Sequence, residues 1–380
     1  MTLIGRQHIV VYVTLCPTMN LEELRARLTA IDRQIIDLAA ERQALVGRIG
    51  EVKQATGSAT RDFRREKQVI DAARDQALAL GLPPELAESL MQLLIESSLT
   101  KQERARVRAE GRGRGKQALV IGGGGKMGQW FAEFLDSQGY EVTIADPVHQ
   151  PATFNCVTDW SATPDSFDLT VVAAPIRISQ EILAAFGDAG RRGLVFDIGS
   201  LKSPLVGTLE QLAGKGLKVT SLHPMFGPDT QLLSGRHVLF LDVGVPEATA
   251  EAKLLFDSTM AQQIDMPLAE HDRLIAFVLG LSHALNIAFF SALAESGESL
   301  PRLEALSSTT FDAQLEVASR VASESPELYF EIQHDNPFNA EALLALAEGV
   351  DRLRTIVERG DREAFVALMA NGCEYLARRA

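Results

Sequence analysis

A glycine-rich turn carries the first chemical signal in the sequence. Gly123, Gly125 and Gly128 stand at the spacing G-x-G-x-x-G, between a short apolar run and an amphipathic segment. Such a turn lets the backbone approach a pyrophosphate, and the amino terminus of the following helix attracts its negative charge. We therefore expect a dinucleotide-binding loop here, with Lys126 and Met127 of the same turn among its contacts.

Two further residues stand where such a loop needs support. Asp146 ends the next apolar run, 23 residues after Gly123, where a carboxylate binds the ribose 2′-hydroxyl. This carboxylate would repel a 2′-phosphate and no Arg follows it, so the sequence favours NAD over NADP. Pro175 ends a later run at the same edge, where termination of a strand explains it as well as contact with a nicotinamide does.

His223 ends another apolar run, so we expect it at the edge where a nicotinamide and a substrate would meet. A neutral imidazole is suited to accept the proton of a hydroxyl group while a hydride leaves the same carbon. Ser200, after the preceding run, would hydrogen-bond that hydroxyl or cap the segment that follows. From position alone, a histidine that bonds only its own turn is an equally good interpretation.

Polar side chains also gather in the first hundred residues. They share a helix face in three segments: Arg42 with Lys53; Asp62 with Arg65 and Glu66; Ser98 with Gln102. Arg42 and Lys53 are 11 residues apart, which is only about 20° of rotation around a helix. A dianionic ligand is one explanation, since Arg pairs bidentately with carboxylates. Solvated, salt-bridged faces are the other, and spacing alone favours them.

A long helix must carry the first of these clusters. From Leu21 to about Gln54 apolar residues recur at helical spacing, and Asn20 is placed to cap the start. At about 50 Å this helix is too long for a small domain to cover, so we expect a partner, most simply a second copy. Two shorter helices follow, over about 61–80 and 85–109, before a basic, glycine-rich stretch that predicts a flexible linker.

After Lys116 short β-branched runs alternate with helical segments, which is typical of βαβ units and a mostly parallel sheet. The runs cover residues 118–121, 142–145, 169–173, 194–198, 219–222 and 238–241. The predicted fold class is therefore multidomain, α and α/β. Its expected parts are an N-terminal extension over 1–18 (or a misassigned start, with Met19 the initiator), a helical domain over 19–110, a linker over 111–116, a Rossmann-type NAD-binding domain over 117–266 and a helical substrate-binding and dimerisation domain over 267–380.

The amino-acid composition argues against several classes of protein. The 380 residues carry 37 Lys and Arg against 50 Asp and Glu, a net charge of −13, which argues against a nucleic-acid partner. The apolar stretch from Ile9 to Cys16 is far shorter than the ~18 residues of a membrane span. Three widely spaced Cys residues predict neither disulfides nor a metal site. We expect a reduced, cytoplasmic protein with no membrane partner.

Several motifs resemble known families. The stretches LEELRARLTAIDRQIIDLAAERQALVGRIGEVK, RDFRREK and LIESSLTKQ are similar to the all-helical class of chorismate mutase. VIGGGGKMG, DIGSLK, SLHPMFGPD and EHDRLIAF are similar to prephenate dehydrogenase. The whole therefore resembles the bifunctional chorismate mutase/prephenate dehydrogenases, the T-proteins of tyrosine biosynthesis. This resemblance implies rearrangement of chorismate to prephenate, then NAD-dependent oxidative decarboxylation to 4-hydroxyphenylpyruvate.

The resemblance also implies roles for residues. The mutase site would use Arg25, Arg42, Lys53, Asp62, Arg65, Glu66, Ser98 and Gln102. The arginines would hold the two carboxylates, with Arg25 reaching into the partner's site, while Lys53 and Gln102 would bond the ether oxygen.

In the dehydrogenase, His223 would accept a hydrogen bond from the substrate's 4-hydroxyl, with help from Ser200. Arg320 would pair with a substrate carboxylate, and His271 would lie near the substrate. His283 matches a further family histidine, whereas Asp312 stands where a basic residue is expected.

Two alternatives remain open from sequence. In the first, the substrate of the dehydrogenase is arogenate rather than prephenate. In the second, the front helices have no mutase activity and serve only as a dimerisation or regulatory module. An NAD-binding regulator without turnover is disfavoured, because the acidic chain shows no DNA-binding feature. We also expect a homodimer, and any feedback by tyrosine would act through the dehydrogenase region.

Overall fold

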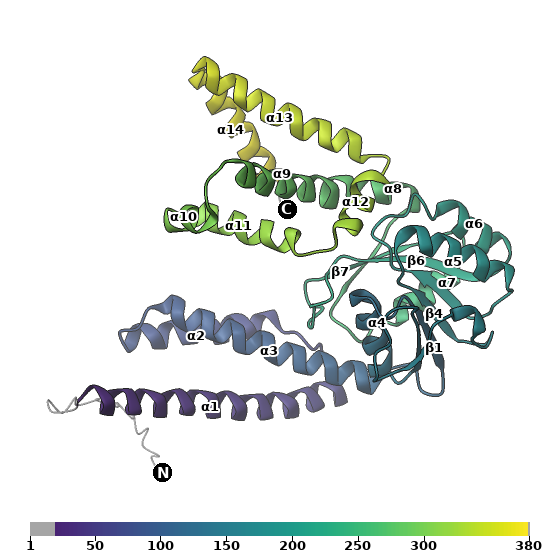
Figure 1. Cartoon of the computed structure of the whole chain (residues 1–380). Helices are drawn as coiled ribbons and strands as arrows, with labels where there is room; N and C mark the ends of the chain where they lie inside the picture. Colours follow the sequence, from purple (N-terminus) through teal and green to yellow (C-terminus); the bar gives the residue numbers. More distant parts are fainter. Residues whose placement is uncertain (1–19, 379–380) are drawn as a thin grey trace, which may run out of the picture. The chain divides into compact units, whose positions relative to one another are not determined.

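The computed structural model describes residues 20–378, and the predicted extension over 1–18 lies outside them. The chain divides into two compact units, the first ending at Arg106 and the second beginning at Val107 (Figure 1).

The first unit is built from helices α1 (Leu21–Ala55), α2 (Phe63–Ala79) and α3 (Pro84–Glu110). Asn20 caps α1 as predicted: its side chain accepts the Glu23 N–H, and the Glu23 side chain accepts the Asn20 N–H. Along α1 the apolar residues of the predicted stripe stay exposed, by 48% at Ile35 and 59% at Leu28. Such a surface on a 35-residue helix needs a partner.

The second unit contains one eight-stranded sheet, ordered β3-β2-β1-β4-β5-β6-β7-β8. Its strands are β1 (Gln117–Ile121), β2 (Glu141–Ala145), β3 (Asn155–Val157), β4 (Leu169–Val172), β5 (Leu194–Asp197), β6 (Lys218–Pro224), β7 (His237–Leu241) and β8 (Gln262–Asp265). All neighbours are parallel except β6 and β7. The strand order reverses between β1 and β4, and open α/β sheets bind ligands at such a switch point.

Helices between the strands cover the sheet. They are α4 (Lys126–Ser137), the short η1 (Trp160–Ala162), α5 (Ile176–Asp188), α6 (Val206–Gly214) and α7 (Pro246–Leu254). Buried strand residues such as Leu119 and Val171 pack with Phe131 of α4 into one continuous core. Helix α4 begins at Lys126, so this residue belongs to its first turn.

The rest of the chain is helical, as predicted, and these helices gather beside the sheet (Figure 1, green to yellow). They are α8 (Leu268–Ile275), η2 (Ala276–Leu281), α9 (Ser282–Glu295), α10 (Leu300–Ala305), α11 (Thr309–Ala322), α12 (Pro326–His334), α13 (Asn339–Arg359) and α14 (Arg362–Ala377). The η2 turn is a π-helix that joins α8 to α9. Such turns are rare and often occur at functional sites.

The expectation of a flexible linker over 111–116 is wrong for two of its glycines. The Gly113 N–H bonds the Gln138 carbonyl at 3.0 Å. A Cβ atom on Gly111 would lie 2.4 Å from the same oxygen, and one on Gly113 would lie 2.3 Å from the Tyr140 ring. These glycines permit close packing rather than mobility.

Candidate active sites

The glycine loop connects β1 to α4 with little room for side chains. Gly122 has a φ of +80°, so the tight turn falls on this residue, one position before the first glycine of the G-x-G-x-x-G spacing. A Cβ on Gly123 would meet the Ile144 side chain at 2.7 Å, and one on Gly128 would meet the Gly122 carbonyl at 2.2 Å. A Cβ on Gly125 would lie 3.4 Å from the Gly122 carbonyl oxygen, a milder contact, and Gly125 forms the N-cap of α4.

The loop fits a dinucleotide. No side chain caps α4, so the N–H groups of its first turn are available to a phosphate. Asp146 is buried, and its carboxylate accepts the Gly124 N–H at 3.0 Å and the Val148 and His149 N–H groups at 2.9 Å. These bonds hold the carboxylate at the end of β2, beside the loop. A carboxylate in this position would repel a 2′-phosphate.

The other predicted loop contacts lie around the same edge. Met127 packs against the core, whereas the Lys126 side chain is exposed and its Nζ lies 3.5 Å from Glu324. Pro175 precedes α5, which also lacks a side-chain cap. The backbone just before Pro175 approaches Gly122 so closely that a Cβ atom on Gly122 would lie 2.8 Å from the backbone of Ala173. The structure thus brings β1 and β4 together at the switch point.

His223 lies at the end of β6 in a buried chain of side chains. Its Nδ1 is 2.9 Å from Nε2 of His271, whose Nδ1 is 2.6 Å from Oδ1 of Asp272. The Asp272 carboxylate also accepts the backbone N–H groups of Lys202 and Ser203, at 3.0 and 2.6 Å. Burial would raise the pKa of Asp272, but these hydrogen bonds lower it to about 2.

A second buried pair lies beneath this chain. The fully buried Lys202 Nζ donates to Asp197 Oδ2 at 2.6 Å and to the Leu222 carbonyl at 2.8 Å. The Ser221 hydroxyl donates to the other Asp197 oxygen at 2.6 Å. Burial, together with His271 and Lys202, holds the pKa of His223 well below its ordinary value. His223 is therefore neutral at pH 7.

His271 requires a correction. We expected it near the substrate, but the ring is fully buried and both nitrogens are engaged, by His223 and by Asp272. It has no nitrogen left for a substrate. Ser200 is half-buried in the turn after β5, at the same edge of the sheet as His223.

The two remaining dehydrogenase residues lie on the C-terminal helices. Arg320 is exposed on α11, where its Nη2 lies 2.5 Å from Glu316 of the same helix, so this chain alone does not bring it to the His223 network. His283 on α9 packs edge-on against Tyr329, with ring centroids 4.3 Å apart. Its buried Nδ1 has no hydrogen-bond partner among the described residues.

In the first unit, α1 and α3 bring several predicted mutase residues together. Arg42 Nη1 donates to the Ser98 hydroxyl at 2.5 Å and to the Leu94 carbonyl at 2.8 Å. Lys53 Nζ donates to the Thr60 carbonyl at 2.6 Å, and Gln102 to the Val46 carbonyl at 3.4 Å. Within residues 20–378 Arg42 and Lys53 have neutral partners only. Two half-buried cations without a carboxylate favour an anionic ligand.

Among the described residues, the contacts of the other four predicted mutase residues do not join them to this pair. Asp62 caps α2 by accepting the Arg65 N–H at 3.0 Å, and Glu66 pairs with Arg61 at 3.0 Å. The Arg25 and Arg65 side chains are exposed.

Sequence reasoning missed three residues of these sites: Gly122, Lys202 and Asp272. Lys202 and Asp272 stand inside quoted motifs, but no spacing rule joins residues 70 positions apart. The signal for Gly122 was its place directly after β1, since the first residue of such a turn takes a positive φ.

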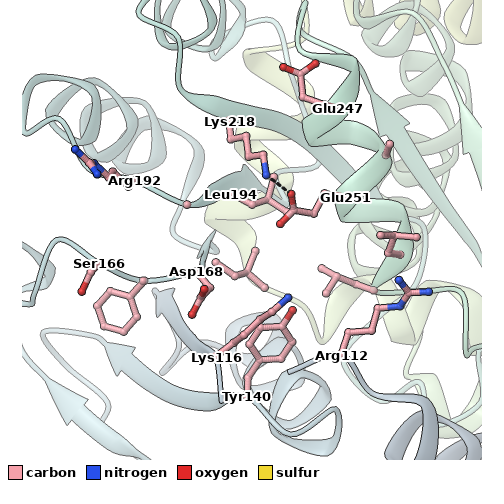
Figure 2. A pocket seen from close by; sticks show the side chains of 16 residues that line it. Arg112, Lys116, Tyr140, Ser166, Asp168, Arg192, Leu194, Lys218, Glu247 and Glu251 are labelled. Atoms are coloured by element: carbon pink, nitrogen blue, oxygen red, sulfur yellow. Dashed lines mark hydrogen bonds and ion pairs between the residues drawn. The ribbon is translucent and has the colours of Figure 1, made fainter. Parts of the chain in front are cut away.

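A cavity of about 720 Å³ lies at the other edge of the sheet, around the first residues of β4, β5 and β6 (Figure 2). Lys218 and Glu251 form an ion pair across it. Ligands of open α/β sheets bind at the carboxyl ends of the strands, and none of the predicted site residues lines this cavity. It is not the dehydrogenase site.

Comparison with known proteins decides between the remaining interpretations. Residues 24–103 match the family described as chorismate mutase type II, residues 141–245 the nucleotide-binding domain of prephenate dehydrogenase, and residues 267–371 its dimerization domain. The chain belongs to the bifunctional chorismate mutase/prephenate dehydrogenase family. It is thus an enzyme of tyrosine biosynthesis with two active sites.

Individual relatives agree with this assignment. The T-protein of Enterobacter agglomerans is 28% identical over 92% of this chain and 91% of its own. A 4-amino-4-deoxyprephenate dehydrogenase of Streptomyces pristinaespiralis is 31% identical over 67% of this chain and 89% of its own. The prephenate dehydrogenase of Aquifex aeolicus, solved with hydroxyphenyl propionate and NAD+, shares the fold with a TM-score of 0.55 at 20% identity, over 69% of this chain and 98% of its own.

The dimerization match also bears on an apolar helix. Among the described residues one helical segment, Leu268–Glu295, is long and apolar enough to cross a membrane by length and composition, with 28% of that window buried. It lies inside the dimerization match. Contact between copies therefore accounts for exposed side chains such as Phe277 and Val278 better than lipid does.

Proposed function

We propose that Arg42, Lys53 and Gln102 form the centre of the mutase site and that His223 is the proton acceptor of the dehydrogenase. The chain rearranges chorismate to prephenate in its helical front end and oxidises prephenate with NAD in the second unit. The observation that carries the second assignment is a buried, neutral histidine at the carboxyl end of β6, one side of which is already bonded to His271.

The mutase needs no covalent catalyst. Arg42, Arg65 and the partner's Arg25 hold the two carboxylates of chorismate, because a guanidinium binds a carboxylate bidentately. Lys53 and Gln102 donate to the ether oxygen as negative charge builds there. Asp62, Glu66 and Ser98 keep these donors in place, as the bond from Arg42 to Ser98 illustrates. Holding the reactive conformer supplies the rest of the acceleration.

In the dehydrogenase, bound NAD would supply the acceptor for the hydride of C4 of prephenate. His223 accepts a hydrogen bond from the 4-hydroxyl and draws its proton away as C4 gains carbonyl character. Ser200 bonds the same hydroxyl. The ring carboxylate then leaves as carbon dioxide, its electron pair makes the ring aromatic, and the oxygen recovers its proton as the phenol of 4-hydroxyphenylpyruvate.

The glycine loop and Asp146 hold the dinucleotide, and Arg320 meets a substrate carboxylate in the dimer. We place the domain boundaries after residues 18, 110, 116 and 266. Tyrosine feedback would act within the second unit, and the enzyme would work in the cytoplasm.

One assay tests the proposal: the full chain is mixed with chorismate and NAD while NADH absorbance is followed. We expect NADH from chorismate alone. His223→Asn should abolish NADH formation from prephenate but leave the loss of chorismate unchanged, and Arg42→Ala should do the reverse. NADH from arogenate in place of prephenate would correct the substrate, and unchanged turnover by His223→Asn would overturn the role of His223.

A further inference from the structure

The histidine at the dehydrogenase site is the first of three buried side chains in line. His223, His271 and Asp272 are 3%, 0% and 3% exposed. Two short contacts join them, 2.9 Å between the rings and 2.6 Å between His271 and the carboxylate. Because His271 and Asp272 are buried, they can affect a bound substrate only through His223.

The direction of each proton follows from the last member. Asp272 accepts backbone N–H groups from Lys202 and Ser203, so its carboxylate is ionised and both of its oxygens act as hydrogen-bond acceptors. Nδ1 of His271 must therefore carry the proton of their shared bond. In a neutral ring the other nitrogen, Nε2, is then an acceptor. Consequently Nδ1 of His223 donates to it, and Nε2 of His223 keeps its lone pair.

We propose that Asp272, acting through His271, holds His223 in the tautomer whose Nε2 is free to accept the substrate hydroxyl proton. Asp272 and His271 are positioning residues, and this role rests on the proposed dehydrogenase function. The opposite tautomer would place a hydrogen on Nε2 and present a donor where the reaction needs an acceptor.

The same line of groups stabilises charge during the reaction. As His223 takes up the proton of the hydroxyl, its growing positive charge is stabilised by the ionised Asp272, with His271 between the two. Lys202, from the turn after β5, opposes that charge, and its own pairing with Asp197 offsets part of the opposition. The charged or titratable groups around His223 are thus His271 and Asp272 of α8, Asp197 at the end of β5 and Lys202 in the turn after it.

The C-terminal helices fix α8 in this position. The Asn336 side chain donates to the Asp272 carbonyl at 2.9 Å, and Gln333 donates to the Gly280 carbonyl at 2.9 Å. Gly280 lies in the π-turn, where a Cβ would meet the Asn339 side chain at 2.1 Å. Helix α12, the turn after it and the start of α13 thereby hold α8 and the π-turn in place, and with them the partner of His223.

The test compares His271→Leu, which removes the acceptor, with His271→Gln, which keeps an acceptor and a donor on one amide. We expect kcat for prephenate oxidation to fall about 100-fold in His271→Leu, within the range for a misplaced general base, and to recover partly in His271→Gln. The KM for NAD should stay unchanged in both. His334→Leu, on the exposed α12 histidine, is the matched control.

A pH profile distinguishes positioning from simple packing. Asp272 raises the pKa of His223, so in Asp272→Asn the acidic limb of kcat should move to lower pH as the rate falls. A lower rate with an unmoved limb in every variant would mean that the residues only pack. Because Asp272 also holds two backbone N–H groups, near-ultraviolet circular dichroism must first show that each variant is folded.

Nitrogen-15 NMR of the full chain reads the tautomer without turnover. The chain has seven histidines, so His223→Asn identifies the signal of interest. We expect a protonated Nδ1 and an unprotonated Nε2 on His223 in the wild type, and a mixture in His271→Leu. A protonated Nε2 in the wild type would overturn the inference. Loss of activity in His223→Asn together with full activity in His271→Leu would leave the proposed function standing and reject this one.

Discussion

At the scale of the residue, His283 is a half-buried base whose buried Nδ1 has no hydrogen-bond partner among the described residues. Burial lowers its pKa from 6.5 to about 4. Above pH 6.5 the ring is neutral in both the folded and the unfolded chain, so it does not affect stability. As the pH falls from 6.5 towards 4, only the unfolded chain takes up the proton, and the free energy of unfolding falls.

We therefore predict that His283→Phe, which keeps the edge-on contact with Tyr329, resists acid better than the wild type. Relative to pH 7, the wild type should lose roughly 2 kcal/mol more stability than the variant at pH 4.5, after allowance for partial screening. Urea midpoints at both pH values measure this difference. His334→Phe, at an exposed site, should follow the wild type. Parallel curves for all three proteins would contradict the assigned burial.

Sequence reasoning located functional residues when a local rule applied to them. His223 and Asp146 end strands, and strand ends can be read from apolar runs. Sequence reasoning failed for His271, because His223 and His271 are 48 positions apart and no sequence rule predicts that their rings meet. Position in a motif identified His271 as functional, but only the packing of α8 on the sheet shows that its nitrogens point inward.

At the scale of the element, the glycine loop depends on contacts between backbones rather than side chains. Its turn at Gly122 and the start of α4 at Gly128 come so close that a methyl group cannot fit between them. The neighbours of that methyl group are a carbonyl oxygen at 2.2 Å and a Cα atom at 2.7 Å, neither of which can rotate away.

Gly128→Ala should accordingly push α4 away from the loop and weaken the cofactor site. We expect the KM for NAD to rise about 10-fold or more, with an unchanged mutase. Gly207→Ala is the matched control, since a Cβ there meets no atom within 4 Å and Ala favours the helix α6. Equal NAD kinetics in the two variants would show that α4 does not support the cofactor.

Element boundaries were predictable where periodicity runs long. Helix α1 ends within one residue of its predicted limit, because its 35 residues repeat one pattern and Asn20 fixes the start. Strands β3 and β8 were missed, since they span three and four residues and leave no alternation to read. The π-turn was also missed; Gly280 within it packs closely against Asn339, and such a long-range contact leaves no local sequence signal.

At the scale of the whole molecule, two apolar surfaces need a partner and lie in different units. One is the exposed stripe along α1, and the other belongs to the helices of the dimerization match. If each surface packs against the same surface of a second copy, the dimer has two separate contacts, and breaking one of them leaves the other intact. The sequence indicated the first surface through the length of the helix, and it predicted a dimerisation domain over 267–380 without indicating which of its side chains stay exposed.

This division predicts that the two activities separate when the α1 contact is broken. Ile35→Lys puts a charge in the exposed stripe, so mutase activity should fall about 10-fold or more, because the partner's Arg25 no longer reaches the site. Asp37→Lys places the same side chain about 200° around the helix, with a larger change of charge, and should leave the mutase intact. Dehydrogenase turnover and the dimer mass from sedimentation should persist in both variants, since the C-terminal helices hold the copies together. Full mutase activity in Ile35→Lys would mean that α1 completes its site within one chain.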